Sequence, residues 1–579
     1  MECVALSKGF HVTDRRTVDG RGNGLFALAV VIFVVLVLVF KAHFAFWINT
    51  DATAYVSIAR QYLAGGFARA VNGYWGPLLS WLLAPLLATG MEPLAAARWI
   101  EVAAGLGTLF AVRWLALRLG ASRRSMGVLA LCLCVPLADY SMLLVTPDIL
   151  LVFLLVMYCG FVLPDAYRER RLYGIGAGLC GGLAYLAKSY ALPFFLVHFV
   201  LINLMHLNRA GVAPAGAASR RREVLLNFAA GLAAFVLVAG PWVGVLTHKY
   251  GQLTCGTAGQ RAHCLVGPEY YGDDPVFGTL IDPPSFDATS YWDDPAIVKL
   301  VAWRPWESED LFYHQLWLIC VNLWTMIRQV TGLIPFAAAA FLYFLGAAMG
   351  GHKSSNGPRS GGTGRDSETR EGAEPVAAVT PDLYAYPLLS KVAVPLLLTV
   401  SVFAGGFLPI YVELRYLWFV VVLLTVMTVL VLQQFAISHK FRSAVWSFLA
   451  TWLVLTCAIP PLNELLAQPD RGREPFELAV KLADTYHVHG NLASNDNWAP
   501  SLFTAFHMRA RYFGQVPKEE RASEEALVAA LKKHGIDYYL VWGAEERLAP
   551  GPLAVKRFPE VTGGAIKGLR VYAMAKPES

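Results

Sequence analysis

Charged residues are scarce in this chain of 579 residues. Lys, Arg, Asp and Glu make up 16% of it, whereas hydrophobic residues make up 56%. Because a soluble domain usually carries about 25% charged residues, this balance excludes a large soluble core as the main body. The net charge of +6 comes from short basic clusters between apolar runs, not from a long basic tract. We therefore expect a polytopic α-helical membrane protein that binds membrane lipid and no nucleic acid.

Cysteine is also scarce, and a Gly-rich phosphate-binding fingerprint and an internal repeat are missing. Seven of the nine cysteines lie in predicted helices or on the predicted cytoplasmic side. Cys255 and Cys264 share one long external loop, so either a disulfide or two unpaired thiols is expected there. With His248 and His263 they match no common zinc spacing, so no metal site is predicted.

About 11 apolar runs approach the roughly 20 residues that a transmembrane helix needs. The predicted cores are 25–46, 96–116, 125–139, 146–163, 173–188, 191–207, 224–246, 328–349, 388–404, 414–435 and 444–460. The basic clusters between them fall on one side, which the positive-inside rule makes cytoplasmic. The first run is too long for a signal peptide and is expected to stay as a helix. We predict a multi-pass protein of the cytoplasmic (inner) membrane, with a cytoplasmic N-terminus.

The chain divides into three parts, and the middle part has three long connections. The parts are a cytoplasmic tail (1–24), a membrane domain (25–460) and a small extracytoplasmic α/β domain with a partly parallel sheet (461–579). The connections are a first external loop (47–95), a long external loop (247–310) and a flexible cytoplasmic linker (350–385). The amphipathic stretch 308–327 is expected to lie in the outer interface of the membrane.

Asp51 follows the first span directly, near the start of a predicted amphipathic helix at the membrane interface. Tyr55 lies on the same helix, and Tyr74 and Trp75 lie in the loop that returns to the membrane. A carboxylate beside aromatic rings at a membrane surface suits chemistry on a lipid-linked polar substrate. The structural alternative is that Asp51 is the N-cap of the helix from Ala52.

Other ionisable residues gather at the outer ends of the predicted spans. Asp139 and Asp148 share the surface of Asp51 and could line one polar cavity, although Asp148 also follows a Thr-Pro pair that starts helices. Lys188 either extends to the headgroups or pairs with an anionic lipid phosphate. Arg415 could pair with Glu413 or with another helix, or bind phosphate oxygens in a bidentate manner. Glu413 is expected to line the same substrate cavity.

Two further charged patterns have an ordinary explanation. Arg98 and Glu101 lie one helical turn apart in the second span, which predicts a local ion pair. The pairs Asp273/Asp274 and Asp293/Asp294 each precede a proline, so they either start turns or bind a divalent cation. The cation is compatible with the sequence but not indicated, and we expect that no cofactor is required.

The order of several short motifs resembles that of membrane glycosyltransferases of the GT-C type. The motifs are Asp51 followed by Tyr55 and Ala59, then GYWGPLLSWLLAP, TPDILLVFLL, GLAYLAKSYALPF and LRYLWFV. The resemblance covers roughly residues 25–440. It is strongest to glycosyltransferase family 39, the branch with protein O-mannosyltransferases and aminoarabinose lipid A transferases.

The resemblance implies a GT-C-like fold and transfer of one hexose or pentose from a polyprenyl-phosphate-linked donor to an extracytoplasmic acceptor. It implies that Asp51 is the catalytic carboxylate, that Lys188 and Arg415 hold the lipid phosphate, and that Asp148 lines the cavity. Many relatives have two consecutive acidic residues where this chain has Asp51 and Ala52, so the acceptor class (lipid, glycan or protein hydroxyl) stays open.

Two other classes of function fit a polytopic chain. A lipid-linked sugar or small-solute transporter or flippase also has many spans and buried charges, but usually has internal repeats. A non-catalytic envelope assembly protein would bind a partner through its external domain. Incorporation of labelled sugar from a polyprenyl-phosphate donor separates the three.

Overall fold

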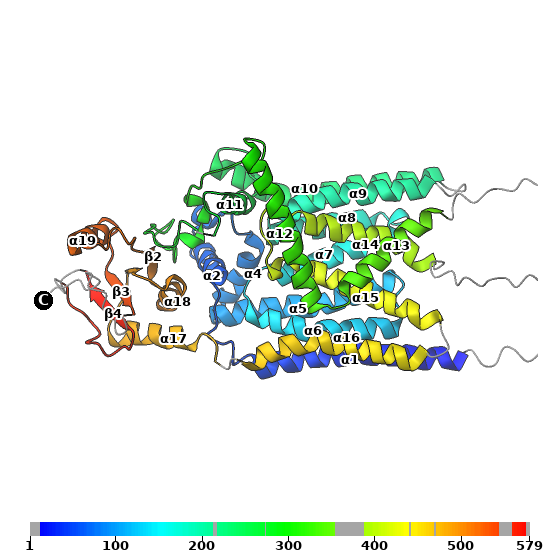
Figure 1. The fold of residues 1–579 in the computed structure, drawn as a ribbon, viewed down its shortest axis with the longest axis horizontal. Coiled ribbons are helices and arrows are strands. Elements are labelled where there is room, and N and C mark those ends of the chain that lie inside the picture. The colour runs from blue at the N-terminus through cyan, green and yellow to red at the C-terminus, as the bar shows by residue number, and fades with distance from the viewer. Residues whose placement is uncertain are drawn as a thin grey trace, which may run out of the picture.

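A bundle of long helices joins a small α/β domain at one of its ends (Figure 1). The computed structural model describes residues 12–211, 217–272, 274–353, 387–438, 442–467, 470–543 and 558–574. The helices of the bundle are α1 (Val12–Phe40), α5 (Pro93–Arg118), α6 (Arg123–Leu143), α7 (Asp148–Val162), α8 (Leu172–Ala187), α9 (Ala191–Gly211), α10 (Ala217–Tyr250), α12 (Glu309–Leu333), α13 (Ala337–Lys353), α14 (Pro387–Gly405), α15 (Trp418–Ser438) and α16 (Arg442–Ala467). We call the end of the bundle that carries the α/β domain the domain end.

The predicted multi-pass architecture is confirmed. Within the described residues, eight helices are long and apolar enough to cross a membrane: α1, α5, α6, α9, α10, α12, α15 and α16. The predicted spans 146–163, 173–188 and 388–404 correspond to the shorter apolar helices α7, α8 and α14. α1 begins at Val12, so the helix extends into the predicted N-terminal tail, and most of the predicted linker 350–385 lies outside the described residues.

The predicted span 328–349 is wrong, because it joins the end of α12 to α13. The break falls at Ile334–Phe336, where Pro335 disfavours a helical conformation for the residue before it. Ile334 is accordingly extended, with φ −129° and ψ 90°.

α12 crosses the bundle at a steep angle near the domain end (Figure 1). Its inner face bonds to the segment after α14: Gln315 donates to Pro409 O, and Asn322 donates to Leu408 O and Ile410 O. The outer face exposes Phe312, Tyr313, Leu316, Trp317, Leu323, Trp324 and Ile327. The predicted place of 308–327 in the membrane interface stays a prediction, because α12 is also long and apolar enough to cross a membrane.

The first external loop folds into α2 (Thr50–Leu63), α3 (Phe67–Ala70) and α4 (Pro77–Ala88). The helix after Asp51 is confirmed, but it does not lie freely at a membrane surface. Every residue from Asp51 to Ala59 is buried, because α2 packs against α4, against the long external loop and against α18 of the α/β domain.

The C-terminal domain has a four-stranded sheet in the order β2-β1-β3-β4. Its elements are α17 (Arg473–Val480), β1 (Asn491–Ser494), α18 (Trp498–Met508), β2 (Arg511–Gln515), α19 (Glu524–Lys533), β3 (Tyr538–Trp542) and β4 (Leu569–Ala573). β1 is parallel to β2 and β3, whereas β4 is antiparallel to β3, so the predicted partly parallel sheet is confirmed. The domain begins later than the predicted residue 461, because α16 continues to Ala467.

The long external loop forms α11 (Ala258–Leu265) and then covers the edge of the sheet at β2. Tyr512 N donates to Thr289 O and Ile281 N donates to Phe513 O, both at 2.7 Å. Val276 and Tyr291 are buried in the same apolar cluster as Leu492. The loop thus joins the α/β domain to α2 and protects an otherwise unpaired strand edge.

Candidate active site

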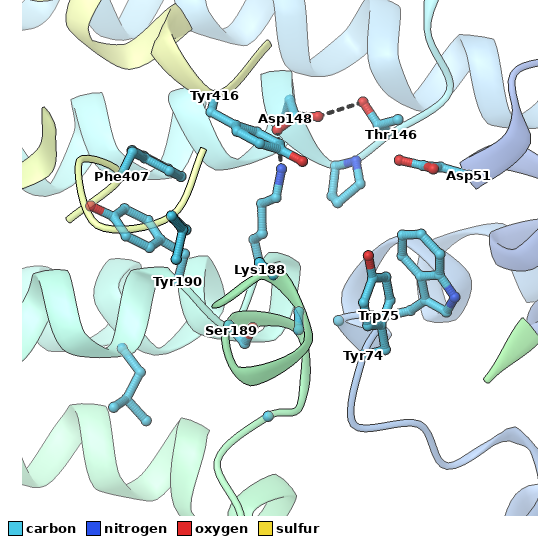
Figure 2. Close-up of a pocket in the computed structure, with 18 of the residues that line it drawn as sticks. Asp51, Tyr74, Trp75, Thr146, Asp148, Lys188, Ser189, Tyr190, Phe407 and Tyr416 are labelled. Atoms are coloured by element: carbon cyan, nitrogen blue, oxygen red, sulfur yellow. Dashed lines mark hydrogen bonds and ion pairs between the residues drawn. The ribbon is translucent and has the colours of Figure 1, made fainter. Parts of the chain in front are cut away.

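A cavity of about 280 Å³ opens at the domain end of the bundle, between α2, the start of α7, the end of α8 and the segment before α15. Asp51, Asp148, Lys188 and Arg415 all line it, although they come from four separate parts of the chain. Figure 2 shows Lys188 extending toward Asp148 and Tyr416, with Tyr74 and Trp75 facing Asp51. The predicted proximity of Asp51, Lys188 and Arg415 is therefore present in the structure.

Asp51 is the second residue of α2 and is only 6% exposed. The helix begins at Thr50 with Asn49 at the N-cap position, so Asp51 is not the N-cap. Its Oδ2 accepts a hydrogen bond from Nη1 of Arg415 in an ion pair between residues 364 positions apart.

Arg415 lies in the short 3₁₀ helix Leu414–Leu417 just before α15. Besides Asp51, its guanidinium contacts Glu413 through Nε at 2.5 Å and Tyr416 Oη through Nη2 at 3.2 Å. Glu413 is 42% exposed and lies outside the cavity lining, so its predicted place in the substrate cavity is wrong. The planar fork of Arg415 thus holds one buried and one exposed carboxylate.

Lys188 and Asp148 form a second ion pair in the same cavity. Lys188 follows α8 in an extended conformation, and its Nζ lies 2.5 Å from Asp148 Oδ1 and 4.2 Å from the centre of the Tyr416 ring. Asp148 is 2% exposed, and its Oδ2 accepts a hydrogen bond from Thr146 Oγ1 at 2.7 Å. The N-cap position of α7 is Pro147, so the predicted cap by Thr146 is wrong: its hydroxyl bonds the carboxylate instead.

Aromatic rings form the walls of the cavity. Tyr55 and Trp75 are tilted with their ring centres 5.1 Å apart, and Tyr74 meets Trp75 edge to face at 4.5 Å. On the opposite side Tyr190 stacks on Phe407 at 4.1 Å. The Tyr190 and Phe407 side was not predicted, although Tyr190 lies two residues after Lys188 in the GLAYLAKSYALPF motif; Phe407 lies in none of the motifs.

Glycine at position 76 allows the Tyr74–Trp75 loop to approach Lys188. A Cβ atom at Gly76 would overlap the carbonyl oxygens of Leu186 and Ala187, at the end of α8. Any other residue would therefore push the loop away from the cavity.

The segments that carry Asp51 and Asp148 are tied together by side chains. Asn49 Oδ1 accepts from Val145 N at 3.0 Å, and Trp47 Nε1 donates to Leu143 O at 2.7 Å. Arg98 donates to carbonyls on both sides, those of Ala45, Trp47 and Met142. The predicted Arg98–Glu101 ion pair is therefore wrong: the arginine bonds backbone acceptors, and Glu101 is fully buried with neither carboxylate oxygen hydrogen-bonded.

Asp293 joins the long external loop to the middle of α2. Its Oδ2 accepts hydrogen bonds from Ser57 Oγ, from Gln61 Nε2 at 3.3 Å and from Thr289 N at 3.1 Å. Burial raises the pKa of the Asp293 carboxyl to about 7, against these hydrogen bonds that lower it. Asp294 next to it pairs with Lys249 of α10 at 2.9 Å. Asp293 thus contacts α2, whereas Asp294 contacts α10.

Two predicted cavity residues, Asp139 and Glu413, do not line the cavity. Asp139 is buried on α6 but does not line the cavity; the charged residues that act on it are Glu464 and Arg471, because this turn of α6 faces α16. Cys255 lines the cavity and Cys264 is buried, and both thiols are free, so of the two expected alternatives the structure has the unpaired thiols. The helical rise from Ala258 to Cys264, about 9 Å, carries the second cysteine away.

Among the described residues, no group of three or more His, Cys, Asp or Glu side chains is placed to hold a metal ion. Asp274 instead pairs with Arg261 at 3.5 Å and accepts from Val276 N in a turn, and Asp273 lies outside the described residues.

Comparison with known proteins finds similarity in fold rather than in sequence. No protein-family model matches the chain, and no curated protein does.

Two solved structures are similar over 96% of this chain. One is ArnT from Cupriavidus metallidurans bound to undecaprenyl phosphate (TM-score 0.53, 13% identity, 98% of that chain), which is also similar in its apo state (TM-score 0.52). The other is the oligosaccharyltransferase AglB from Archaeoglobus fulgidus, in complex with an inhibitory peptide and a dolichol-phosphate (TM-score 0.52, 12% identity, 74% of that chain). The chain therefore has the GT-C fold that the motif resemblance implies.

Proposed function

We propose that this protein is an integral membrane glycosyltransferase that moves one sugar from a polyprenyl-phosphate-linked donor to an acceptor hydroxyl. The single observation that carries the proposal is the meeting of Asp51, Arg415, Lys188 and Asp148 in one cavity with aromatic walls. A carboxylate beside two cations provides a base and a phosphate site within one enclosure. The aromatic rings suit the apolar face of a sugar.

Asp51 acts as the general base in this proposal. Its carboxylate takes the proton of the acceptor hydroxyl while that oxygen bonds to the anomeric carbon. The bond from the anomeric carbon to the phosphate oxygen breaks at the same time, so the electron pair leaves with polyprenyl phosphate. Attack from the face opposite to the leaving group inverts the anomeric carbon.

Lys188 and Arg415 stabilise the negative charge that gathers on the departing phosphate. Arg415 is a positioning group for Asp51 as well, because the ion pair fixes where the carboxylate lies in the cavity. When a donor phosphate engages the guanidinium, Arg415 releases Asp51, and the carboxylate is then free to accept the proton of the acceptor hydroxyl. Two cations supply the charge that the leaving group needs, so the proposal includes no cofactor.

The fold neighbours and the charge pattern support the donor class and the orientation. ArnT and AglB have been seen with undecaprenyl phosphate and a dolichol-phosphate, respectively, so a GT-C bundle accommodates such a carrier. We propose that the domain end, with the cavity and the α/β domain, faces the extracytoplasmic side of the inner membrane. The positive-inside rule supports this orientation.

The test is transfer of labelled sugar from a polyprenyl-phosphate donor by the purified chain, compared between wild type and Asp51→Asn. Loss of a general base should lower turnover by about 100-fold to 10,000-fold. Asp310→Asn is the matched control, because Asp310 is exposed at the start of α12 and the same charge is removed. Near-normal transfer by Asp51→Asn would refute the role of Asp51.

The same assay addresses the alternatives. A transporter or flippase would move the lipid-linked sugar across a vesicle membrane without changing its covalent linkage. An assembly protein would do neither.

A further inference from the structure

A second cleft lies at the other end of α2 from Asp51, between this helix, residues 286–289 of the long external loop and the α/β domain. Its volume is about 590 Å³. Arg60, Arg509 and Arg511 all line it; the first lies on α2, the second ends α18 and the third begins β2. Arg60 follows Asp51 by nine residues, a helical rise of about 14 Å, so the cleft and the Asp51 cavity are separate sites.

The cleft has more cations than available acids. No ion pair joins Arg60, Arg509 or Arg511 to a carboxylate within the part of the chain that the structure describes. Two carboxylates line the cleft, and both are engaged. Glu92 caps α5 by accepting from Leu94 N and Ala95 N, and Asp287 holds Arg69 with both oxygens.

Arg60 and Arg511 are half-buried, whereas Arg509 is exposed, and the charge of Arg509 acts on Arg60. Arg60 lies over the ring of Phe506, with its Cζ 5.0 Å from the ring centre. Burial and then the charge of Arg509 lower the pKa of Arg60 to about 10, against the charges of Glu92 and Asp293, which raise it. Nε of Arg511 is buried without a hydrogen-bond acceptor. Such an arrangement is costly by itself and becomes favourable when an oxyanion enters.

We propose that this cleft is a binding site for a phosphate group. A phosphate has the charge and the number of acceptor oxygens to take hydrogen bonds from several guanidiniums together, and arginine forks match its geometry. The group could be free phosphate, a phosphate ester or a lipid headgroup, and its chemistry is the same in each. The proposal does not depend on the transfer reaction at Asp51.

The test is a titration with inorganic phosphate of the full chain in phosphatidylcholine nanodiscs, followed by the thermal unfolding midpoint. Sodium chloride of equal ionic strength is the salt control. The titration uses an Arg415→Gln background, so that phosphate binding at the Asp51 cavity is weakened and is the same in every variant compared. Arg509→Gln and Arg511→Gln should each weaken the apparent affinity by about 10-fold to 100-fold, the loss expected for a hydrogen bond to a charged group.

Arg473→Gln is the matched control, because Arg473 is an exposed arginine of the same domain that lines no part of the cleft. A second arm replaces part of the phosphatidylcholine by phosphatidic acid. If phosphatidic acid raises the unfolding midpoint of the Arg415→Gln background, the site is supported and a lipid headgroup is identified as its occupant. The rise should be lost when Arg509→Gln and Arg511→Gln are added to that background. The proposal is overturned if the cleft variants respond to phosphate like their background in both arms, or if chloride reproduces the phosphate response.

Discussion

The two ends of α2 place charge in opposite ways. At its start, each cation has an acid: Arg415 pairs with Asp51, and Lys188 pairs with Asp148. At its end, three arginines share a cleft whose two carboxylates are engaged by other groups. Where each cation has a carboxylate, the carboxylate can accept a proton and the cation can release a phosphate product. Cations without a free carboxylate retain a bound anion instead. The same helix thus supports a site suited to chemistry and a site suited to retention.

The largest expected effect is that removing a cation lowers the stability of the fold at the start of α2 but not at its end. Lys188→Gln leaves the buried Asp148 carboxylate without its cation and should destabilise the fold by about 3 kcal/mol. This is the lower end of the usual range, because Lys188 is 25% exposed. Arg509→Gln removes a repulsion on Arg60 and should leave stability unchanged or raise it. Denaturant unfolding in detergent measures both.

The double variant Lys188→Gln/Asp148→Asn checks the cause. It should recover most of the lost stability without recovering sugar transfer, because the unpaired charge is gone but the phosphate site is not restored. Equal destabilisation by Lys188→Gln and Arg509→Gln would remove the distinction between the two ends.

The middle of α2 should respond to pH. The pKa of Asp293, about 7 in the folded chain, exceeds the value of 3.8 for an unburied aspartate. The folded state therefore binds a proton that the unfolded state has released, and stability should fall as pH rises from 5 to 7, by roughly 2 kcal/mol from this residue. Thermal midpoints at several pH values should show this slope for wild type and a flatter one for Asp293→Asn. An unchanged slope in the variant would assign the pH dependence to other groups.

A smaller effect is expected where the charge is kept and only its geometry changes. Arg415→Lys retains a cation but cannot reach Asp51, Glu413 and Tyr416 together, so transfer should fall by about tenfold. Arg473→Lys, exposed in the α/β domain, should leave the rate within twofold of wild type. A rate for Arg415→Lys equal to wild type would mean that charge alone is needed at this position.

The elements of the fold could largely be predicted from the sequence, because each depends on local patterns. Apolar runs predicted most of the bundle, and alternating short strands and helices predicted the C-terminal sheet. The predictions were wrong where one local sequence pattern is compatible with two structures. Pro335 divides one long apolar stretch into α12 and α13, and Arg98 prefers three backbone carbonyls on other segments to Glu101 one turn away.

The candidate site was predicted only in part. Asp51, Lys188 and Arg415 were found through the order of motifs, and the structure brings them together; their roles remain predictions. The arginine cleft gave no signal, because Arg60 lies about 450 positions from Arg509 and Arg511 and no motif links them. An excess of arginines over free carboxylates can be recognised only when the fold shows which carboxylates already have a partner.

The smallest expected effect concerns how Arg60 tolerates burial next to other arginines. Its guanidinium lies over the Phe506 ring, and a partly desolvated contact of this kind contributes about 0.5–1 kcal/mol. A double-mutant cycle with Arg60→Gln and Phe506→Leu should therefore give a coupling energy of that size in denaturant unfolding. Because Phe506 also packs on Ala52 and Val56, the single variant Phe506→Leu loses packing as well, which the cycle removes. A coupling near zero would mean that the ring only fills space, and that Arg60 is held in the cleft by α2 alone.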